Sequence, residues 1–317
     1  MYYENTQNVA VYSFMGRFGF YLRKTFPALC GKAYLAYQRV SMNRYYKKAI
    51  ANIMRCEFIV PFQIFIETIN RCNGMCPFCP CNKYEDKRQL KKMSEELFIK
   101  IIDELARNDY CGILMLSGNC EPFLDDRITR FINIAYERLP KAQKLLYTNG
   151  SLLTKEKMAE IAGKLDILHI NNYSKEYKLI APIQEVYNYV KTHAASFGDM
   201  RVKIELRYAN EVLSNKGGTA PNNKNYRKVY KHACLHPYMD AFIFPDGVVG
   251  LCCNDNSEVT NFGDVNDENL YDIFNGKKLQ AVRVAIKDGR NGYNFCKYCD
   301  FMSIPGRRKR WIETGRD

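Results

Sequence analysis

Four cysteines, Cys72, Cys76, Cys79 and Cys81, lie within ten consecutive residues. The first three have the spacing C-x3-C-x2-C and bring three thiols into one short loop. Three thiolates so close together suit an iron–sulfur cluster or a zinc ion. Structural zinc favours four ligands in paired C-x2-4-C units, and a single residue between Cys79 and Cys81 is too short for that pairing. A [4Fe–4S] cluster held by three cysteines instead leaves one iron open to an outside ligand.

The cysteine content of the whole chain supports a metal rather than disulfides. There are 13 cysteines among 317 residues, and an odd number argues against a framework made only of disulfides. No apolar run reaches the roughly 18 residues that span a bilayer, and the N-terminus lacks the pattern of a signal peptide. We therefore expect a cytoplasmic chain, in a compartment where clustered thiols bind metal or do chemistry.

The elements that position these thiols alternate between strand and helix. A strand rich in aromatic and β-branched residues, 62–68, runs directly into the cysteine loop. Further strands are expected at 112–117, 144–150, 167–172 and 202–208. Amphipathic helices are expected at 94–108, 125–139, 154–165 and 183–195. This order predicts an α/β protein with a parallel sheet in a partial barrel, whose chemistry lies at the carboxyl ends of the strands.

Three regions are expected along the chain: a basic helical N-terminal extension (1–58), the partial barrel (59–210) and a small Cys-rich α+β domain (211–317). In the Cys-rich domain, the sequence of residues 240–251 predicts a hairpin that turns at Asp246–Gly247. A helix is expected after it, at 269–288. The net charge is +13, and residues 1–56 hold nine basic side chains against one acid, Glu4. These charges suit a solvated helical layer, or attraction to a phosphate-bearing substrate or a membrane surface. No nucleic-acid partner is expected, because no such motif is present.

The segment "CNGMCPFC" after a first strand resembles the signature of the radical S-adenosylmethionine (radical SAM) superfamily. The resemblance implies a partial (β/α)6 TIM-like barrel in which Cys72, Cys76 and Cys79 hold a [4Fe–4S] cluster. SAM would chelate the fourth iron and be cleaved to methionine and a 5′-deoxyadenosyl radical, which abstracts a hydrogen atom. Phe78 takes the aromatic position near the adenine.

Four further segments resemble the SAM-binding parts of the family. "LSGNCEPFLD" resembles its Gly-Gly-Glu segment, which implies that Gly118 and Glu121 bind the amino group of SAM, although Asn119 and Cys120 replace the small residues expected there. "YTNG" implies a place for Asn149 in the SAM pocket. By the same resemblance Asn172 would meet the ribose, and Arg207 would face the SAM carboxylate; ordinary turn or surface roles are the alternative for these three.

A second set of cysteines resembles the family's SPASM extension in its shortened "twitch" form. Cys234 is followed after twelve residues by Gly247, after four more by Cys252, and later by a C-x2-C pair, Cys296 and Cys299. The resemblance implies that these four cysteines bind a fully ligated auxiliary [4Fe–4S] cluster suited to electron transfer, with structural zinc as the alternative. The spacing from Gly247 favours Cys252 over the adjacent Cys253 as the ligand.

These features lead to a dehydrogenase as the first hypothesis, because twitch-bearing members of the family include an aminocyclitol dehydrogenase. An alcohol carbon of a sugar, aminocyclitol or other polyol, free or nucleotide-linked, would lose hydrogen, and the remaining electron would leave through the auxiliary cluster to give a ketone. An epimerase is the second hypothesis, with Cys120 or Cys253 returning a hydrogen atom. Maturation of a ribosomal peptide and a non-catalytic Cys-rich protein are further alternatives. An enzyme of this kind needs an electron donor such as flavodoxin or ferredoxin.

Overall fold

The computed structural model describes residues 46–223 and 228–301, residues 29 and 43, and the backbone of residues 2–5 and 9–13. Most of the basic N-terminal extension, residues 224–227 and the tail from 302 onward lie outside the described residues. The prediction of a basic helical layer is therefore tested only at the start and the end of residues 1–58.

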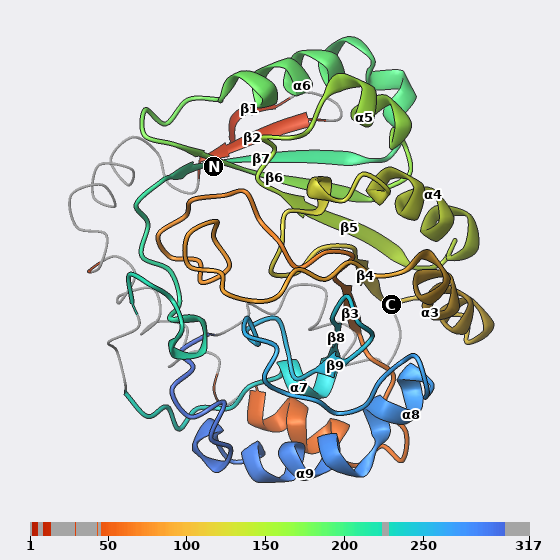
Figure 1. The fold of residues 1–317 in the computed structure, drawn as a ribbon, viewed down its shortest axis with the longest axis vertical. Helices are drawn as coiled ribbons and strands as arrows, with labels where there is room; N and C mark the ends of the chain where they lie inside the picture. The colour runs from red at the N-terminus through yellow and green to blue at the C-terminus, as the bar shows by residue number, and fades with distance from the viewer. Residues whose placement is uncertain are drawn as a thin grey trace.

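In the part of the chain that the structure describes, one sheet of nine strands has the order β1-β2-β7-β6-β5-β4-β3-β8-β9 (Figure 1). Its central strands are β3 (Gln63–Ile66), β4 (Ile113–Met115), β5 (Gln143–Thr148), β6 (Ile167–Ser174) and β7 (Arg201–Tyr208). They lie side by side in chain order, and each neighbouring pair is parallel. This confirms the predicted α/β class and the partial barrel.

Four crossover helices cover one face of these strands (Figure 1): α3 (Glu95–Arg107), α4 (Ile128–Arg138), α5 (Lys155–Glu160) and α6 (Ala181–Thr192). Helix α3 begins where Ser94 Oγ accepts a hydrogen bond from the Leu97 amide at 3.1 Å, a side-chain N-cap. Among the described residues, four short 3-10 helices lie in the connections: η1 (Pro122–Leu124), η2 (Ala194–Phe197), η3 (Lys216–Gly218) and η4 (Arg290–Gly292).

The two faces of the sheet have different side chains because successive residues of a strand point in opposite directions. Toward the helices the strands present apolar residues that are fully buried, such as Ile64, Ile66, Leu146, Leu168, Ile170 and Ile204. On β5, β6 and β7 most of the alternate residues are polar or aromatic and at least partly exposed, among them Tyr147, His169, Asn171, Tyr173, Glu205 and Arg207. The second face is therefore the one that can receive a polar ligand.

The C-terminal part contributes strands to the same sheet. The predicted hairpin is confirmed: β8 (Asp240–Ile243) and β9 (Val249–Gly250) are antiparallel, and Gly247 in the turn has φ +95°, where a side chain would be strained. In addition, β8 pairs in parallel with β3, in register from Gln63 to Ile66. The cysteine-rich region thus continues the barrel sheet on the side of the strand that leads into the first cysteine loop.

The helices of this part differ slightly from the expectation. The single helix expected at 269–288 is two helices, α8 (Leu270–Asn275) and α9 (Lys277–Ile286). The break is at Gly276, whose backbone is extended and where a side chain would be crowded by the carbonyl oxygens of Asp272 and Ile273, both 3.1 Å from a Cβ placed there. A short helix, α7 (His236–Met239), precedes β8.

The first residues of the chain also differ from the expectation. They form β1 (Tyr2–Asn5) and β2 (Val9–Ser13) rather than helix, and β2 pairs in parallel with β7 from Val9 to Ser13. The physical reason is the open edge of β7, which a short segment rich in aromatic and β-branched residues can extend. Helix is present at 46–53, and just after it the Ile59 amide donates to Asn275 Oδ1 at 2.8 Å, beside α8.

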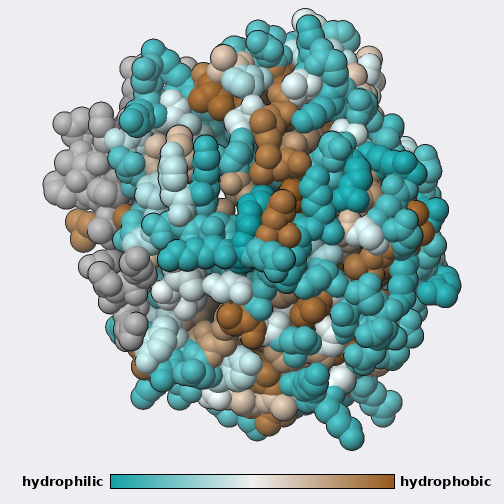
Figure 2. All heavy atoms as spheres, in the orientation of Figure 1, coloured by the Kyte–Doolittle hydropathy of each residue, from teal (hydrophilic) through white to brown (hydrophobic). Residues whose placement is uncertain are grey.

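The face of the molecule seen in Figure 2 is mostly hydrophilic, with apolar atoms in smaller patches. Among the described residues, no helix is long and apolar enough to cross a membrane.

Candidate functional site

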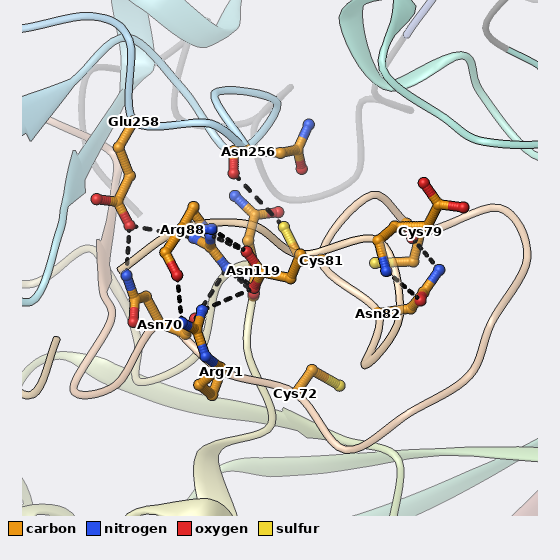
Figure 3. Close-up of polar contacts among 12 residues, drawn as sticks. Asn70, Arg71, Cys72, Cys79, Cys81, Asn82, Arg88, Asn119, Asn256 and Glu258 are labelled. Carbon is orange, nitrogen blue, oxygen red and sulfur yellow. Dashed lines mark hydrogen bonds and ion pairs between the residues drawn. The ribbon is translucent and has the colours of Figure 1, made fainter. Parts of the chain in front are cut away.

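The cysteine loop follows β3 directly and is held by its own backbone and by Asn82. The Cys79 amide donates to the Cys76 carbonyl at 3.0 Å, and the Lys83 amide donates to the Gly74 carbonyl at 2.8 Å. Nδ2 of the buried Asn82 side chain donates to the carbonyl oxygen of Cys76 at 3.1 Å. The same nitrogen donates to the carbonyl oxygen of Cys79 at 2.7 Å (Figure 3). These bonds close the loop so that its cysteines are presented from one compact turn.

Gly74 marks the point around which two of the thiols gather. A Cβ added at Gly74 would lie 3.3 Å from Cys72 Sγ and 3.8 Å from Cys76 Sγ, so a side chain there would occupy the space between the two sulfurs. The Gly74 amide also points at Cys72 Sγ, at 3.3 Å. Burial raises the pKa values of the Cys72 and Cys76 thiols to about 12. Metal binding must therefore displace their protons.

Half-buried Cys79 and buried Cys81 form a pair. A hydrogen bond between the Cys81 and Cys79 side chains lowers the pKa of Cys79 and raises that of Cys81. Cys81 Sγ also lies 3.6 Å from the carbonyl oxygen of Asn256, a residue of the C-terminal part (Figure 3). Of the two, Cys79 is the readier thiolate, and Cys81 is a neighbour that hydrogen-bonds to it.

Arg88 joins the cysteine loop to the C-terminal part through charged groups that the motifs did not reveal (Figure 3). Its guanidinium binds Asp86 at 2.9 Å and Glu258 at 3.2 Å, and donates to the carbonyl oxygens of Asn70 (3.0 Å) and Asn119 (3.1 Å). A guanidinium has five donors in a rigid fork, which explains how one side chain can bind several segments. The loop before the cysteines and the loop after β4 are thereby held together.

Gly118 and Asn119 lie against Glu67, the residue that follows β3. A Cβ at Gly118 would lie 2.7 Å from Glu67 Cγ and 2.6 Å from Phe242 Cζ, so only glycine allows this approach. The Asn119 amide donates to Glu67 Oε1, while Glu67 Oε2 and Asn119 Nδ2 are buried without a hydrogen-bond partner among the described residues. Burial raises the pKa of Glu67 to about 8, against the lowering effect of Arg88. Sequence reasoning missed Glu67, because no motif singles it out.

Glu121, the expected ligand of the SAM amino group, lies between the ends of β4 and β5. Its carboxylate accepts hydrogen bonds from Thr148 Oγ1 (2.7 Å), the Asn149 amide (2.7 Å) and the Phe123 amide (3.2 Å). Burial raises its pKa, and these hydrogen bonds oppose the rise. The carboxylate is thus held at the expected edge of the sheet, and its contact with SAM stays a prediction.

The two asparagines expected near SAM have different surroundings. Asn149 lies beside the cysteine loop, where its Nδ2 donates to Asn73 Oδ1 at 2.8 Å and lies 4.0 Å from Cys72 Sγ. Asn172 is fully buried, and its amide donates to the Lys178 carbonyl (2.8 Å) and accepts from the Ile180 amide (2.9 Å). Both polar ends of Asn172 thus hold the loop that leads into α6.

Phe78 and Arg207 both lie against the ring of Tyr173. The Phe78 and Tyr173 rings lie 5.5 Å apart, and the Arg207 guanidinium lies 5.8 Å from the Tyr173 ring. Arg207 also pairs with Glu211 and, at 3.4 Å, with Glu205. Its charge is close enough to Cys76 to lower the pKa of that thiol against the effect of burial. The structure therefore brings Phe78 and Arg207 together beside the cysteine loop.

Farther down the same face lies a histidine–carboxylate pair that the sequence did not single out. His169 Nε2 is 3.1 Å from Glu205 Oε2, and each side chain is 20% exposed. The Tyr147 ring stacks on His169 at 4.7 Å. Alternation of side chains along β6 and β7 was the available signal, since it places both residues on the face away from the helices.

The four C-terminal cysteines also lie near one another. Cys234, Cys252, Cys296 and Cys299 are all buried. Burial raises the pKa of Cys252 well above its ordinary value, and the nearby thiols of Cys253, Cys296, Cys234 and Cys299 raise it further. Cys252 therefore belongs to the buried group, whereas Cys253 is half-buried beside it. That Cys252 rather than Cys253 is the ligand stays a prediction.

Two polar side chains accompany these four thiols. Asn254 Nδ2 lies 3.8 Å from Cys299 Sγ. Arg290 is buried, and the thiols raise its pKa although burial alone lowers it. Four converging thiols beside a buried cation suit a metal centre with net negative charge, which a (Cys)4-ligated [4Fe–4S] cluster has. Within the described residues, no group of three or more His, Cys, Asp or Glu side chains is arranged so that it could hold a metal ion.

The two candidate hydrogen donors lie in different places. Cys120 is near Cys72, Glu67 and Glu121, and burial raises its pKa well above the ordinary value, so its thiol keeps its proton at neutral pH. Cys253 lies next to the C-terminal thiols and not in the cysteine loop after β3.

Comparisons with known proteins agree with this arrangement. Residues 66–172 match the family model of the radical SAM superfamily, and residues 234–300 match SPASM, an iron–sulfur cluster-binding domain. Over 244 residues the chain is 24% identical to the S-adenosyl-L-methionine-dependent 2-deoxy-scyllo-inosamine dehydrogenase of Niallia circulans, covering 76% of this chain and 93% of the relative. A shorter match, 30% identical over 100 residues, covers 27% of a tungsten-containing aldehyde ferredoxin oxidoreductase cofactor-modifying protein of Pyrococcus furiosus and 31% of this chain.

The fold is shared with a solved structure. The crystal structure of BtrN in complex with AdoMet and 2-DOIA is similar with a TM-score of 0.65 and 22% identity, over 77% of this chain and 95% of that chain. This likeness shows the common fold.

Proposed function

Because this chain belongs to the radical SAM superfamily and carries a SPASM iron–sulfur domain, we propose that it oxidises an alcohol carbon of a sugar, aminocyclitol or other polyol to a ketone. One observation carries the proposal. A three-thiol loop after β3 and four buried C-terminal thiols occur together in a chain that matches 93% of a 2-deoxy-scyllo-inosamine dehydrogenase.

The two sets of cysteines would bind two different clusters. Cys72, Cys76 and Cys79 would hold a [4Fe–4S] cluster with one iron left for SAM, and Cys234, Cys252, Cys296 and Cys299 would hold an auxiliary cluster. When bound, the first cluster and SAM would supply a one-electron reaction that removes a hydrogen atom from carbon. The auxiliary cluster would supply an exit for the second electron. The residues of the chain determine which hydrogen is removed and where the proton goes.

The residues that would bind SAM surround the cysteine loop. Phe78 offers a ring next to Cys79, and Arg207, which lies near Cys76, offers a fixed charge for a carboxylate. Glu121 offers a buried carboxylate for an ammonium group, Gly118 allows close approach of the backbone, and Asn149 lies beside Cys72. Asn172 acts through the loop it holds, because both ends of its amide are already used.

The hydroxyl proton of the substrate needs an acceptor, and His169 is suited to this task. When Nε2–H donates to Glu205, the other ring nitrogen, Nδ1, has a free lone pair. The Glu205 carboxylate orients the ring through this hydrogen bond. The stacked Tyr147 ring fixes the plane of the imidazole. We place the substrate hydroxyl beside His169, on the face of the sheet away from the helices.

Mass analysis of the product tests the proposal. Reduced, iron-loaded enzyme would be incubated with SAM and a panel of aminocyclitols, sugars and their nucleotide-linked forms. A product lighter by two hydrogens, formed together with 5′-deoxyadenosine, supports oxidation. The same mixture without SAM is the control and should form no product. A failure to release 5′-deoxyadenosine with every substrate would contradict the proposal.

An epimerase is the second candidate, and Cys120 is the observation in its favour. Its thiol is protonated at neutral pH and lies near Cys72. An epimerised product keeps its mass but takes up deuterium from heavy water. Cys120→Ala should leave a dehydrogenase competent, whereas an epimerase that uses this thiol should lose its product. Cys253→Ala is the matched variant for the other candidate donor.

The partners follow from the chemistry. The substrate would be a small molecule, and a one-electron donor of the flavodoxin or ferredoxin type would reduce the first cluster. A peptide substrate is the alternative, and a short precursor peptide encoded nearby would favour it. Contact of the basic N-terminal segment with a membrane surface falls outside the described residues.

A further inference from the structure

Arg290 is a buried cation in the C-terminal part. It begins the short helix η4 and is 1% exposed. Its Nη1 donates to the Cys299 carbonyl at 2.9 Å, and its Nη2 donates to the carbonyl of Ala233, which precedes Cys234, at 3.4 Å. Its Nε is buried without a hydrogen-bond partner among the described residues. The guanidinium is thus held between the backbones of two of the cysteine segments.

A buried guanidinium needs a negative partner, because taking a charge out of water is costly unless it is paired. The ion pairs found in the described part of the chain include none between Arg290 and a carboxylate. The groups that interact with it electrostatically are the four thiols, those of Cys234, Cys252, Cys296 and Cys299. Its counter-charge is therefore the centre that these thiolates form.

A second buried arginine in the same region provides a comparison. Arg283, on α9, is fully buried, donates to the Pro237 carbonyl at 2.8 Å and lies over the Phe274 ring at 4.3 Å. Burial lowers its pKa to about 10. The two arginines share residue type and burial but differ in their neighbours, since Arg283 contacts an aromatic ring and Arg290 contacts the cysteine segments.

We propose that Arg290 is a fixed counter-charge that raises the reduction potential of the auxiliary cluster and so makes it a better electron acceptor. An electron added to the cluster makes it more negative, and a nearby positive charge in a low-dielectric site stabilises that reduced form more than the oxidised one. This inference rests on the proposed function. There, the substrate carbon that has lost a hydrogen atom loses one electron to the cluster and its hydroxyl proton to a base. The carbon is oxidised and the cluster is reduced by one electron.

Redox titration of the iron-loaded full chain tests the proposal. The auxiliary signal is followed by electron paramagnetic resonance, and the cluster with the open iron is identified because SAM alters its spectrum. Arg290→Gln removes the charge but keeps polar donors, and Arg290→Lys keeps the charge. We expect Arg290→Gln to lower the ratio of reduced to oxidised auxiliary cluster at least tenfold at a fixed potential, a shift of about 59 mV for one electron. Arg290→Lys should stay closer to the wild type.

Arg283→Gln is the matched control, and it should leave the auxiliary potential unchanged. An unchanged potential in Arg290→Gln, or an equal shift in Arg283→Gln, would overturn the proposal. If Arg290→Gln fails to assemble the cluster, the same potential is read from Arg290→Met and Arg290→Lys: a lowered value in Met alone supports the proposal, and equal values overturn it. A colourless zinc protein overturns both this inference and the proposed function. A shifted potential in an enzyme that oxidises no polyol supports Arg290 and contradicts only the substrate class.

Discussion

Asn82 allows a quantitative test of how the cysteine loop is held. The side chain is 4% exposed, and its two ends have different partners. Its nitrogen donates to the carbonyl oxygens of Cys76 and Cys79, and its oxygen accepts from the amides of Tyr84 (2.9 Å) and Glu85 (3.1 Å). One amide therefore fixes both the turn between two proposed ligands and the chain that leaves the loop.

The expected effect follows from the count of these bonds. Asn82→Ala removes four hydrogen bonds, and at about 0.5–1.5 kcal/mol each the loop loses roughly 2–6 kcal/mol of ordering free energy. Asn82→Asp keeps the acceptor that serves Tyr84 and Glu85, but it turns a carboxylate oxygen toward the carbonyl oxygens of Cys76 and Cys79, so it loses both donated bonds and adds repulsion between acceptors. First-cluster occupancy should therefore fall in both variants relative to the wild type.

The assay is iron content, together with release of 5′-deoxyadenosine from SAM. Wild-type protein with two four-iron clusters holds about eight irons per chain, and Asn82→Ala should approach about four, those of the auxiliary cluster. Asn188→Ala, on the exposed surface of α6, is the control and should keep the wild-type iron content. Full iron and wild-type SAM cleavage in Asn82→Ala would contradict this role of Asn82, because they would show that the cluster itself orders the loop.

Three more predictions follow from single residues. His169→Gln should keep SAM cleavage but lose ketone formation, as measured by product mass, because the proton acceptor is gone. Burial raises the pKa of Glu67 from 4.5 to about 8, so the folded protein holds a proton that the unfolded chain has released, and stability falls as pH rises through that window. Glu67→Gln should therefore show a smaller change in the free energy of unfolding between pH 5 and pH 8 in urea titrations. Cys252→Ala should lose the auxiliary cluster signal, whereas Cys253→Ala should keep it.

The sequence predicted the parts of the fold that depend on local pattern. The alternation of strands and helices from β3 to β7 follows from apolar periodicity, and the cap at Ser94 is a short-range signal. The Asp246–Gly247 turn predicts the hairpin of β8 and β9. The break at Gly276 was missed because the apolar pattern continues on both sides of it.

The features that the sequence did not reveal depend on contacts between distant residues. The pairing of β8 with β3 joins segments more than 170 residues apart, and no local pattern specifies which edge of a sheet a hairpin will extend. The charged residues Glu67, Arg88 and Glu258 look like ordinary surface residues in the sequence, and only burial distinguishes them. Arg290 was missed for the same reason, since an arginine beside four thiols is recognised only when the thiols come together.

The segment 252–258 connects the two thiol centres, which argues against an auxiliary domain that is simply appended to the barrel. Near its start Asn254 lies 3.8 Å from Cys299 Sγ, in its middle the Asn256 carbonyl accepts from Cys81, and at its end Glu258 binds Arg88 (Figure 3). Glu258 has φ +54°, a backbone conformation that a non-glycine residue adopts only when its surroundings compensate for it. The contacts of Glu258 with Asn70 and Lys91, at 2.9 and 2.7 Å, provide that compensation. A rearrangement at the C-terminal thiols would therefore reach the loop that carries Cys72, Cys76 and Cys79 through this one stretch of backbone.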